Sequence, residues 1–298
     1  MSFFQSQRLT EHRQGKQRLE EIERQRAYAI ILHYACEAFS NAHGRSSRIA
    51  SISYYHLHDG QTTSHSISQN AQRRKYDVKS MTEKELDECE KQLLKDFVKK
   101  VKEESKAEWI HWKMRNATYG FEALSNRCDV LGVRWKTIHD NTKHDLPAIL
   151  ELVYTKSYEQ EKPDGTLVGL CTRNKIPVTD MLRGDKEGLA FRERRFKDID
   201  MSNHRKVEVI AKIYELAASN KLRVRPTKMT IYGANPPGVI EWVKNNWLLA
   251  VLVPLAISLA LAAYEPIVQA FAGTSGQSGN TPAAKSGADG DTTTTTTQ

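Results

Sequence analysis

The segment from Trp247 to Tyr264, WLLAVLVPLAISLALAAY, constrains this chain most, because its 18 residues include no charged side chain. An α-helix rises about 1.5 Å per residue, so this segment approaches the roughly 30 Å thickness of the hydrocarbon core of a bilayer. The two terminal aromatic rings suit the level of the lipid headgroups. We therefore expect a transmembrane helix over residues 241–268. A buried core helix is the alternative, but no further folded sequence is expected after it.

The charges around this segment predict its orientation. Five lysines and arginines lie between Lys221 and Lys244, whereas Lys285 is the only basic residue that follows the apolar segment. Positive charge stays on the cytoplasmic side of membranes. We therefore expect a single-pass protein with a cytoplasmic N-terminal part and a tail on the opposite side. The charged N-terminal sequence has no apolar run of the kind that signal peptides contain.

The part of the chain that precedes the apolar segment is basic. Residues 1–239 have a net charge of +10, and the remainder has a net charge of −2. A basic surface suits nucleic acid or anionic lipid headgroups, although ordinary solubility explains a modest excess equally well. The four cysteines are scattered and form no CxxC pair or Cys/His cluster, which is typical of reduced cytosolic thiols.

Changes in composition divide the chain into five parts. We expect a charged helical arm over 1–26, a folded domain over 27–225, a linker over 226–240, the transmembrane helix over 241–268, and a disordered low-complexity tail over 269–298. In the arm, Leu9, Leu19 and Ile22 are too sparse to form a core face. The arm is therefore expected to be solvated or to bind a protein partner.

Hydrophobic periodicity within the folded domain predicts a mixed sheet with helices packed against it. The expected strands are residues 29–37, 48–57, 62–68 and 107–114. The expected helices are residues 82–105, 119–130, 146–154 and 205–218. Asp59-Gly60 is a strong hairpin signal, so the first three strands should be antiparallel. The fourth strand follows a helix, which therefore forms the crossover to it.

Three short segments of this domain occur in a recognisable order. Ala35-Cys36-Glu37 ends the first strand, Asn116-Ala117-Thr118-Tyr119-Gly120 opens a helix, and His204-Arg205-Lys206-Val207-Glu208 lies on the last helix. They resemble the three motifs of the DEDD superfamily of 3′–5′ exonucleases, which are Asp-x-Glu, Asn followed by Tyr or Phe and Asp, and a Tyr- or His-led motif that ends in Asp. His111 also resembles a His that often precedes the Asn of the second motif.

The resemblance implies an α/β, ribonuclease-H-like fold in which four carboxylates hold two metal ions, Mg²⁺ or Mn²⁺, for hydrolysis. In this chain Ala35 and Gly120 occupy two of the four acidic positions, so that only Glu37 and Glu208 remain as metal ligands. A metal pair with two carboxylates is short of negative charge. We therefore expect a domain that keeps the fold, has lost efficient hydrolysis and needs no cofactor.

The expected function is binding, at the cytosolic face of a membrane, of single-stranded nucleic acid, of a nucleotide or of a protein partner. The expected nucleic-acid contacts are His111, Asn116, Tyr119 and His204, together with the basic residues Arg73, Arg74 and Lys75, which can meet phosphates. Two alternatives stay open. One is an active metal-dependent 3′–5′ exonuclease whose missing acids are supplied by residues such as Asp140 or Asp145. The other is a membrane effector whose soluble domain senses a partner.

Overall fold

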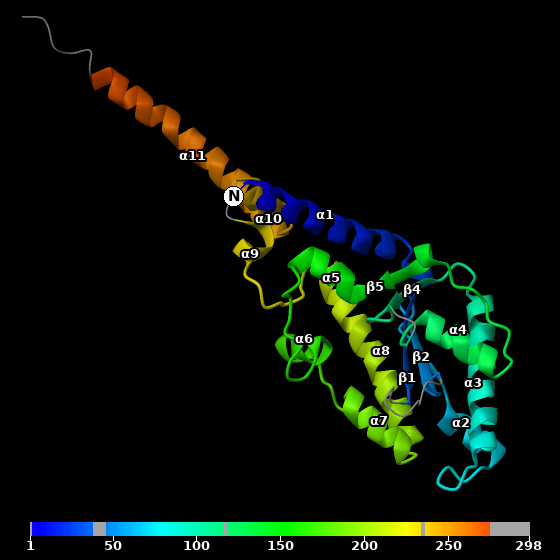
Figure 1. Ribbon diagram of the computed structural model, residues 1–298. Coiled ribbons are helices and arrows are strands. Elements are labelled where there is room, and N and C mark those ends of the chain that lie inside the picture. The colour runs from blue at the N-terminus through cyan, green and yellow to red at the C-terminus, as the bar shows by residue number, and fades with distance from the viewer. Residues whose placement is uncertain (1, 38–45, 116–117, 234–235, 275–298) are drawn as a thin grey trace, which may run out of the picture. The chain divides into compact units, whose positions relative to one another are not determined.

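The computed structural model describes residues 2–37, 46–115, 118–233 and 236–274 (Figure 1). The chain divides into two compact units, Met1–Trp242 and Val243–Gln298. The first unit contains the sheet and all the cavities discussed below, and the second contains the long apolar helix. The predicted tail lies almost entirely outside the described residues.

The first unit is built on a five-stranded mixed sheet. Its strands are β1 (Ala29–Cys36), β2 (Ile49–His56), β3 (Thr62–Ser66), β4 (Glu108–His111) and β5 (Lys143–Asp145), in the order β3-β2-β1-β4-β5. The pairs β1–β2 and β2–β3 are antiparallel, and β4 and β5 continue the sheet in parallel with β1. The predicted antiparallel trio and the crossover to a fourth strand are confirmed. The three-residue β5 was not predicted, because it is too short to show periodicity.

Helices cover both faces of the sheet (Figure 1). On one face lie α2 (Ile67–Arg74), α3 (Glu83–Glu103) and α4 (Phe121–Val130), and on the other lie α1 (Ser2–Arg24), α5 (Leu146–Tyr154) and α8 (Phe196–Ala218). Successive side chains of a strand point to opposite faces. Accordingly Leu32 and Tyr34 pack in the core beside α3 and α4, whereas Ile31 packs in the core beside α5 and α8.

The strongest local signals are confirmed at residue level. Thr82 and Glu85 form the predicted capping box at the start of α3, and α5 has the predicted bounds. Helix α8 begins nine residues before the predicted position, because its first turns bury polar residues such as Ser202 and Asn203, which give no apolar periodicity. Several short elements were not assigned from the sequence: α2, whose first residues lie in the strand predicted over 62–68, α6 (Thr166–Asn174), α7 (Gly184–Arg192), α9 (Lys228–Tyr232) and the 3₁₀ helices Arg26–Tyr28 and Asp140–Thr142.

The N-terminal arm is helical, but the expectation that its apolar residues are too sparse to form a core face is wrong. Leu9, Leu19 and Ile22 are buried, and two of them belong to the core beside α5 and α8. A polar side chain of α1 also packs against the domain. His12 is buried, and its Nδ1 lies 2.8 Å from the carbonyl oxygen of Val153. Three apolar residues suffice here because a buried polar side chain completes the contact face.

The predicted linker is partly structured. Helix α9 lies within it, and the side chains of Ile231 and Tyr232 are buried in the core beside α5 and α8. The ring of Tyr232 contacts that of His12 on α1, with 4.7 Å between the ring centroids. Helix α10 (Pro236–Lys244) follows, so most of the described residues in the range 226–240 are helical.

The apolar segment forms helix α11 (Trp247–Thr274), which starts after a break at residues 245–246 and extends six residues beyond the predicted end. The break separates it from α10, so the single helix expected over 241–268 is interrupted. Among the residues that the structure describes, no single helix has the length and hydropathy of a membrane span. By length and composition, Pro236–Lys244 and Leu248–Tyr264 together could form one as a bent pair.

The contact between α1 and α5 gives a first prediction. A Cβ atom at Gly15 would lie 2.7 Å from Val153 Cγ2 and 2.8 Å from the Val153 backbone nitrogen, which leaves no room for it. Overpacking of this kind costs about 1–3 kcal/mol. Gly15→Ala should therefore lower the free energy of unfolding in urea, although alanine favours a helix. Gly184→Ala is the matched control, because a Cβ there meets nothing within 4 Å. Equal stabilisation by both changes would contradict the close packing of α1 on α5.

Candidate functional site

The residues that the sequence singles out do not share one cavity. Glu37 lines a cavity at the carboxyl end of β1, which we call the arginine cavity. His204 and Glu208 line a second cavity beside α8, which we call the acidic cavity. His111 lines a third, the histidine cavity, at the carboxyl ends of β4 and β5. Asn116 lies outside the described residues.

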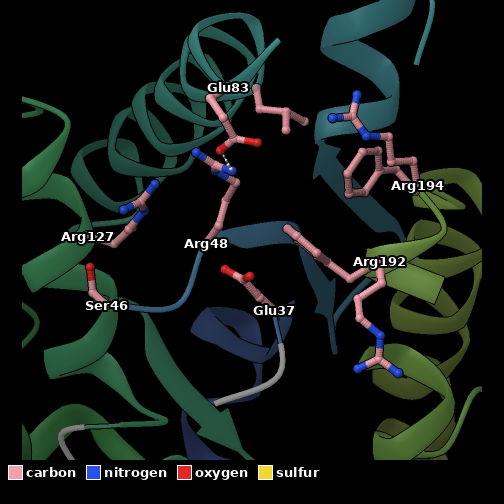
Figure 2. Close-up of a pocket in the computed structure, with 10 residues that line it drawn as sticks. Glu37, Ser46, Arg48, Glu83, Arg127, Arg192 and Arg194 are labelled. Atoms are coloured by element: carbon pink, nitrogen blue, oxygen red, sulfur yellow. Dashed lines mark hydrogen bonds and ion pairs between the residues drawn. The ribbon is translucent and has the colours of Figure 1, made fainter. Parts of the chain in front are cut away.

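The arginine cavity has a volume of about 330 Å³ and is formed by segments far apart in the sequence (Figure 2). Glu37 directly follows β1, and Arg48 directly precedes β2. Figure 2 shows Arg127 on one side of these two residues and the segment that carries Arg192 and Arg194 on the other. The full lining is Glu37, Ser46, Arg48, Glu83, Leu86, Arg127, Phe191, Arg192, Arg194 and Phe196.

A buried carboxylate beside this cavity orients two of its lining arginines, Arg127 and Arg48. Glu90 of α3 is completely buried, and Arg127 of α4 donates to it through Nε (2.7 Å) and Nη2 (2.6 Å). The backbone N–H of Ile49, the first residue of β2, donates to the same carboxylate over 2.8 Å. The Nε of Arg48 lies 3.4 Å from it. Glu90 therefore fixes two arginines and a strand end around one point, and its charge is compensated.

The outer arginines of the cavity are less fully neutralised. Arg194 donates to the backbone carbonyls of Val78 and Met81, and its positive charge has no acidic partner among the described residues. Arg192 is exposed and makes no ion pair with a described residue. The side chain of Glu37 likewise makes no hydrogen bond or ion pair with a described residue. Two uncompensated guanidinium groups beside a concave surface favour an anion with several acceptor oxygens.

The acidic cavity, about 350 Å³ in volume, contains a carboxylate that the sequence analysis did not single out. Asp200 of α8 accepts hydrogen bonds from the hydroxyls of Ser51 (2.8 Å), Ser64 (2.7 Å) and Ser66 (3.0 Å), and from the side-chain amide of Gln69 (3.2 Å). Serines that alternate along two strands were the available signal, since such residues share one face of a sheet. The carboxylate is thus committed to holding α8 against β2 and β3.

Glu208, the other expected metal ligand, lies on the surface of α8. It forms ion pairs with Arg205 (2.8 Å) and with His204 (3.4 Å), both on the same helix. Among the described residues, no group of three or more His, Cys, Asp or Glu side chains is placed to hold a metal ion. Asp140 and Asp145, considered above as replacement acids, line the histidine cavity and do not line the cavity of Glu37.

Tyr119 lies in a buried polar network. Its hydroxyl is 3.1 Å from Nε2 of His33 and donates to the carbonyl oxygen of Tyr34 over 2.9 Å. Burial, together with the nearby charge of Lys206, lowers the pKa of His33 to about 3. The ring is therefore neutral at pH 7, and its Nδ1–H donates to Oδ1 of Asn203 over 2.8 Å. The Tyr119 hydroxyl thus serves to join the start of α4 to β1.

The basic segment Arg73–Lys75 ends helix α2. Arg73 lies 3.7 Å from Asp96, and Arg74 lies 3.8 Å from Glu88, both of which are acids of α3. Lys75 has left-handed backbone angles and closes the helix. This segment is exposed, but two of its three charges are partly compensated, so it is a weaker anion site than the arginine cavity.

Comparisons with known proteins leave the identity of the chain open. No family model matches it, and no curated protein matches it either.

The floor of the arginine cavity supplies a second prediction. Removing one partner of a buried ion pair costs about 3–5 kcal/mol, whereas an exposed pair contributes about 0–1 kcal/mol. Glu90→Gln should therefore strongly reduce the free energy of unfolding. Glu83→Gln is the matched control, because Glu83 binds the same Arg48 but its side chain is 74% exposed. Chemical denaturation of both variants is the measurement. Similar small losses would mean that Glu90 does not organise the cavity.

Proposed function

We propose that this chain is a membrane-attached, exonuclease-like protein that binds single-stranded nucleic acid in the arginine cavity without hydrolysing it efficiently. The observation that carries the proposal is the composition of this cavity. At the end of β1, where the resemblance to exonucleases implies a cluster of acids, four arginines surround Glu37. Guanidinium groups bind phosphate oxygens in pairs, whereas a two-metal site needs several carboxylates.

The fold supports the comparison with exonucleases. The resemblance implies three antiparallel strands followed by a strand reached through a helical crossover, and β1, β2, β3, α3 and β4 follow this order. We propose on this basis that the first unit has a ribonuclease-H-like fold. The departures in the motifs support the loss of hydrolysis, because Ala35 is buried and Glu208 lines a different cavity from Glu37.

Membrane attachment is the second part of the proposal, and it rests on α11. Large apolar side chains of this helix are exposed at many successive positions, namely Leu248, Val251, Leu252, Leu255, Ile257, Leu259 and Leu261. A helix that is apolar on every side needs an apolar environment. The bent pair of α10 and α11 could provide the span by length and composition. The basic residues before it favour a cytosolic position for the first unit.

The nucleic-acid part predicts a salt-dependent affinity that needs the outer arginines. In fluorescence anisotropy with a labelled single-stranded DNA oligonucleotide, the full chain in detergent should bind more weakly as salt rises, because condensed counterions are released. Arg192→Ala with Arg194→Ala should weaken binding about tenfold or more, as expected for the loss of hydrogen bonds to a charged group. Lys99→Ala with Lys102→Ala, on the exposed side of α3, is the charge-matched control.

The same samples test hydrolysis. With Mg²⁺ or Mn²⁺ the oligonucleotide should stay intact, and Glu37→Ala should change nothing. Degradation that Glu37→Ala abolishes would instead show an active two-metal exonuclease. Equal loss of binding in the two double variants would mean that net charge, and not the arginine cavity, attracts the nucleic acid. A larger loss from Arg73→Ala with Arg74→Ala would place the binding surface at the end of α2.

The membrane part predicts how the chain fractionates. The full chain should pellet with membranes and resist extraction by carbonate, because burying about 18 apolar residues makes insertion effectively irreversible. Replacing Leu252 and Leu255 by lysine should release it, whereas replacing both by isoleucine should not. Release of the unmodified chain by high salt alone would show a peripheral, electrostatic attachment and contradict the proposed span.

A further inference from the structure

The histidine cavity lies where the parallel strands β4 and β5 end, and it has a volume of about 480 Å³. His111 is the last residue of β4, and Asp145 is the last residue of β5. In sheets with parallel strands, ligands bind outside the carboxyl ends of the strands. The volume is in the range of pockets that hold small molecules. None of its lining residues belongs to the arginine cavity.

Two helices begin at this cavity. Phe121, the first residue of α4, and Ala148, in the first turn of α5, both line it. The residues that precede these helices, Gly120 and Asp145, make no capping hydrogen bond through a side chain. The first backbone N–H groups of a helix have no partner within the helix, and they favour an anion. Pro147 in the first turn of α5 has no N–H, so the backbone donors are the first N–H groups of α4 and those of α5 other than Pro147.

His111 adds a donor that is already oriented. The backbone N–H of Met114 donates to its Nδ1 over 3.3 Å, so Nδ1 acts as the acceptor. Burial, with Arg115, His144 and Lys143 nearby, lowers the pKa of His111 to about 3, so the ring is neutral at pH 7. Its single proton is therefore on Nε2. The side chain is only 4% exposed, and Nε2 has no hydrogen-bond partner among the described residues.

The charges around the cavity also favour an anion. Arg115 forms an ion pair with Asp145, which compensates the innermost acid. Lys143 pairs with Asp140 over 2.8 Å, but the side chain of Asp140 is 98% exposed, and such pairs are weak. Arg18 of α1 is exposed and makes no ion pair within the described parts of the chain. The remaining acid, Glu122, is exposed. Arg18 and Lys143 are thus available to an incoming ligand.

We propose that the histidine cavity binds the phosphate group of a small phosphorylated molecule. The Nε2–H of His111 and the first N–H groups of α4 and α5 donate to the phosphate oxygens, and Arg18 and Lys143 compensate its charge. The ligand is either inorganic phosphate or a phosphate monoester of nucleotide size. This inference does not depend on the proposed binding of nucleic acid, because the two cavities share no residue.

Isothermal titration calorimetry of the full chain in detergent tests the proposal, with inorganic phosphate, adenosine monophosphate and adenosine as probes. Phosphate or adenosine monophosphate should bind, and adenosine should not. Tighter binding of adenosine monophosphate would identify an organic phosphate as the ligand, and equal affinities would identify phosphate alone. Failure of both phosphates to bind at millimolar concentrations, or equal binding of adenosine, would overturn the proposal.

Substitutions locate the binding within the molecule. His111→Asn keeps an acceptor for Met114 N–H but removes the donor that faces the cavity, and it should weaken binding about tenfold, as for a hydrogen bond to a charged group. His111→Gln places an amide near the position of Nε2 and should retain more affinity. Arg18→Gln, at an exposed site, should weaken binding without a change in folding. Arg24→Gln, at the end of the same helix, is the control. Wild-type affinity in both His111→Asn and Arg18→Gln would place the ligand elsewhere.

Discussion

The buried carboxylate of Glu90 is the interaction on which the first unit depends most. It receives hydrogen bonds from a side chain of α4 and from the first backbone N–H of β2, while it is itself part of α3. A buried charge is costly unless it is paired and hydrogen-bonded, so these three elements have to meet at one point. The arginine cavity is the outer side of this arrangement. Two of its four arginines, Arg48 and Arg127, therefore lie there because the fold compensates one internal charge.

On the opposite face of the sheet, a carboxylate and an amide with serine partners join a helix to the strands. Helix α8 is joined to the strands through Asp200 and Asn203, which accept from or donate to serine hydroxyls of β2 and β3. Side-chain networks of this kind fix the position of the helix along the strands, because a shift would break several hydrogen bonds at once. The two faces therefore differ in chemistry, with an arginine–carboxylate cluster on one and a serine network on the other.

These two clusters also explain how far the sequence could be interpreted. A continuous apolar run located β1, an alternating pattern located β2, and a capping box located α3, because such patterns are encoded by neighbouring residues. The sequence around Glu90 and Asp200 gave no signal of their roles, since their partners lie 37 to 149 residues away. The motif around Glu37 correctly indicated a strand end. It did not indicate that four arginines, most of them distant in sequence, surround this residue. The burial of α1 was missed for a related reason, because a face with few apolar residues can still be covered.

The position of α1 has a consequence for how the chain acquires its structure during synthesis. This helix is synthesised long before its partners α5 and α9, which end at Tyr154 and Tyr232. Contacts between residues so far apart in sequence form late and carry a large loop-closure entropy. The apolar residues of α1 therefore stay exposed to solvent until nearly the whole first unit has been translated. The apolar segment of α11 follows only 15 residues after Tyr232. The first unit is thus completed at nearly the same time as the hydrophobic helix is synthesised.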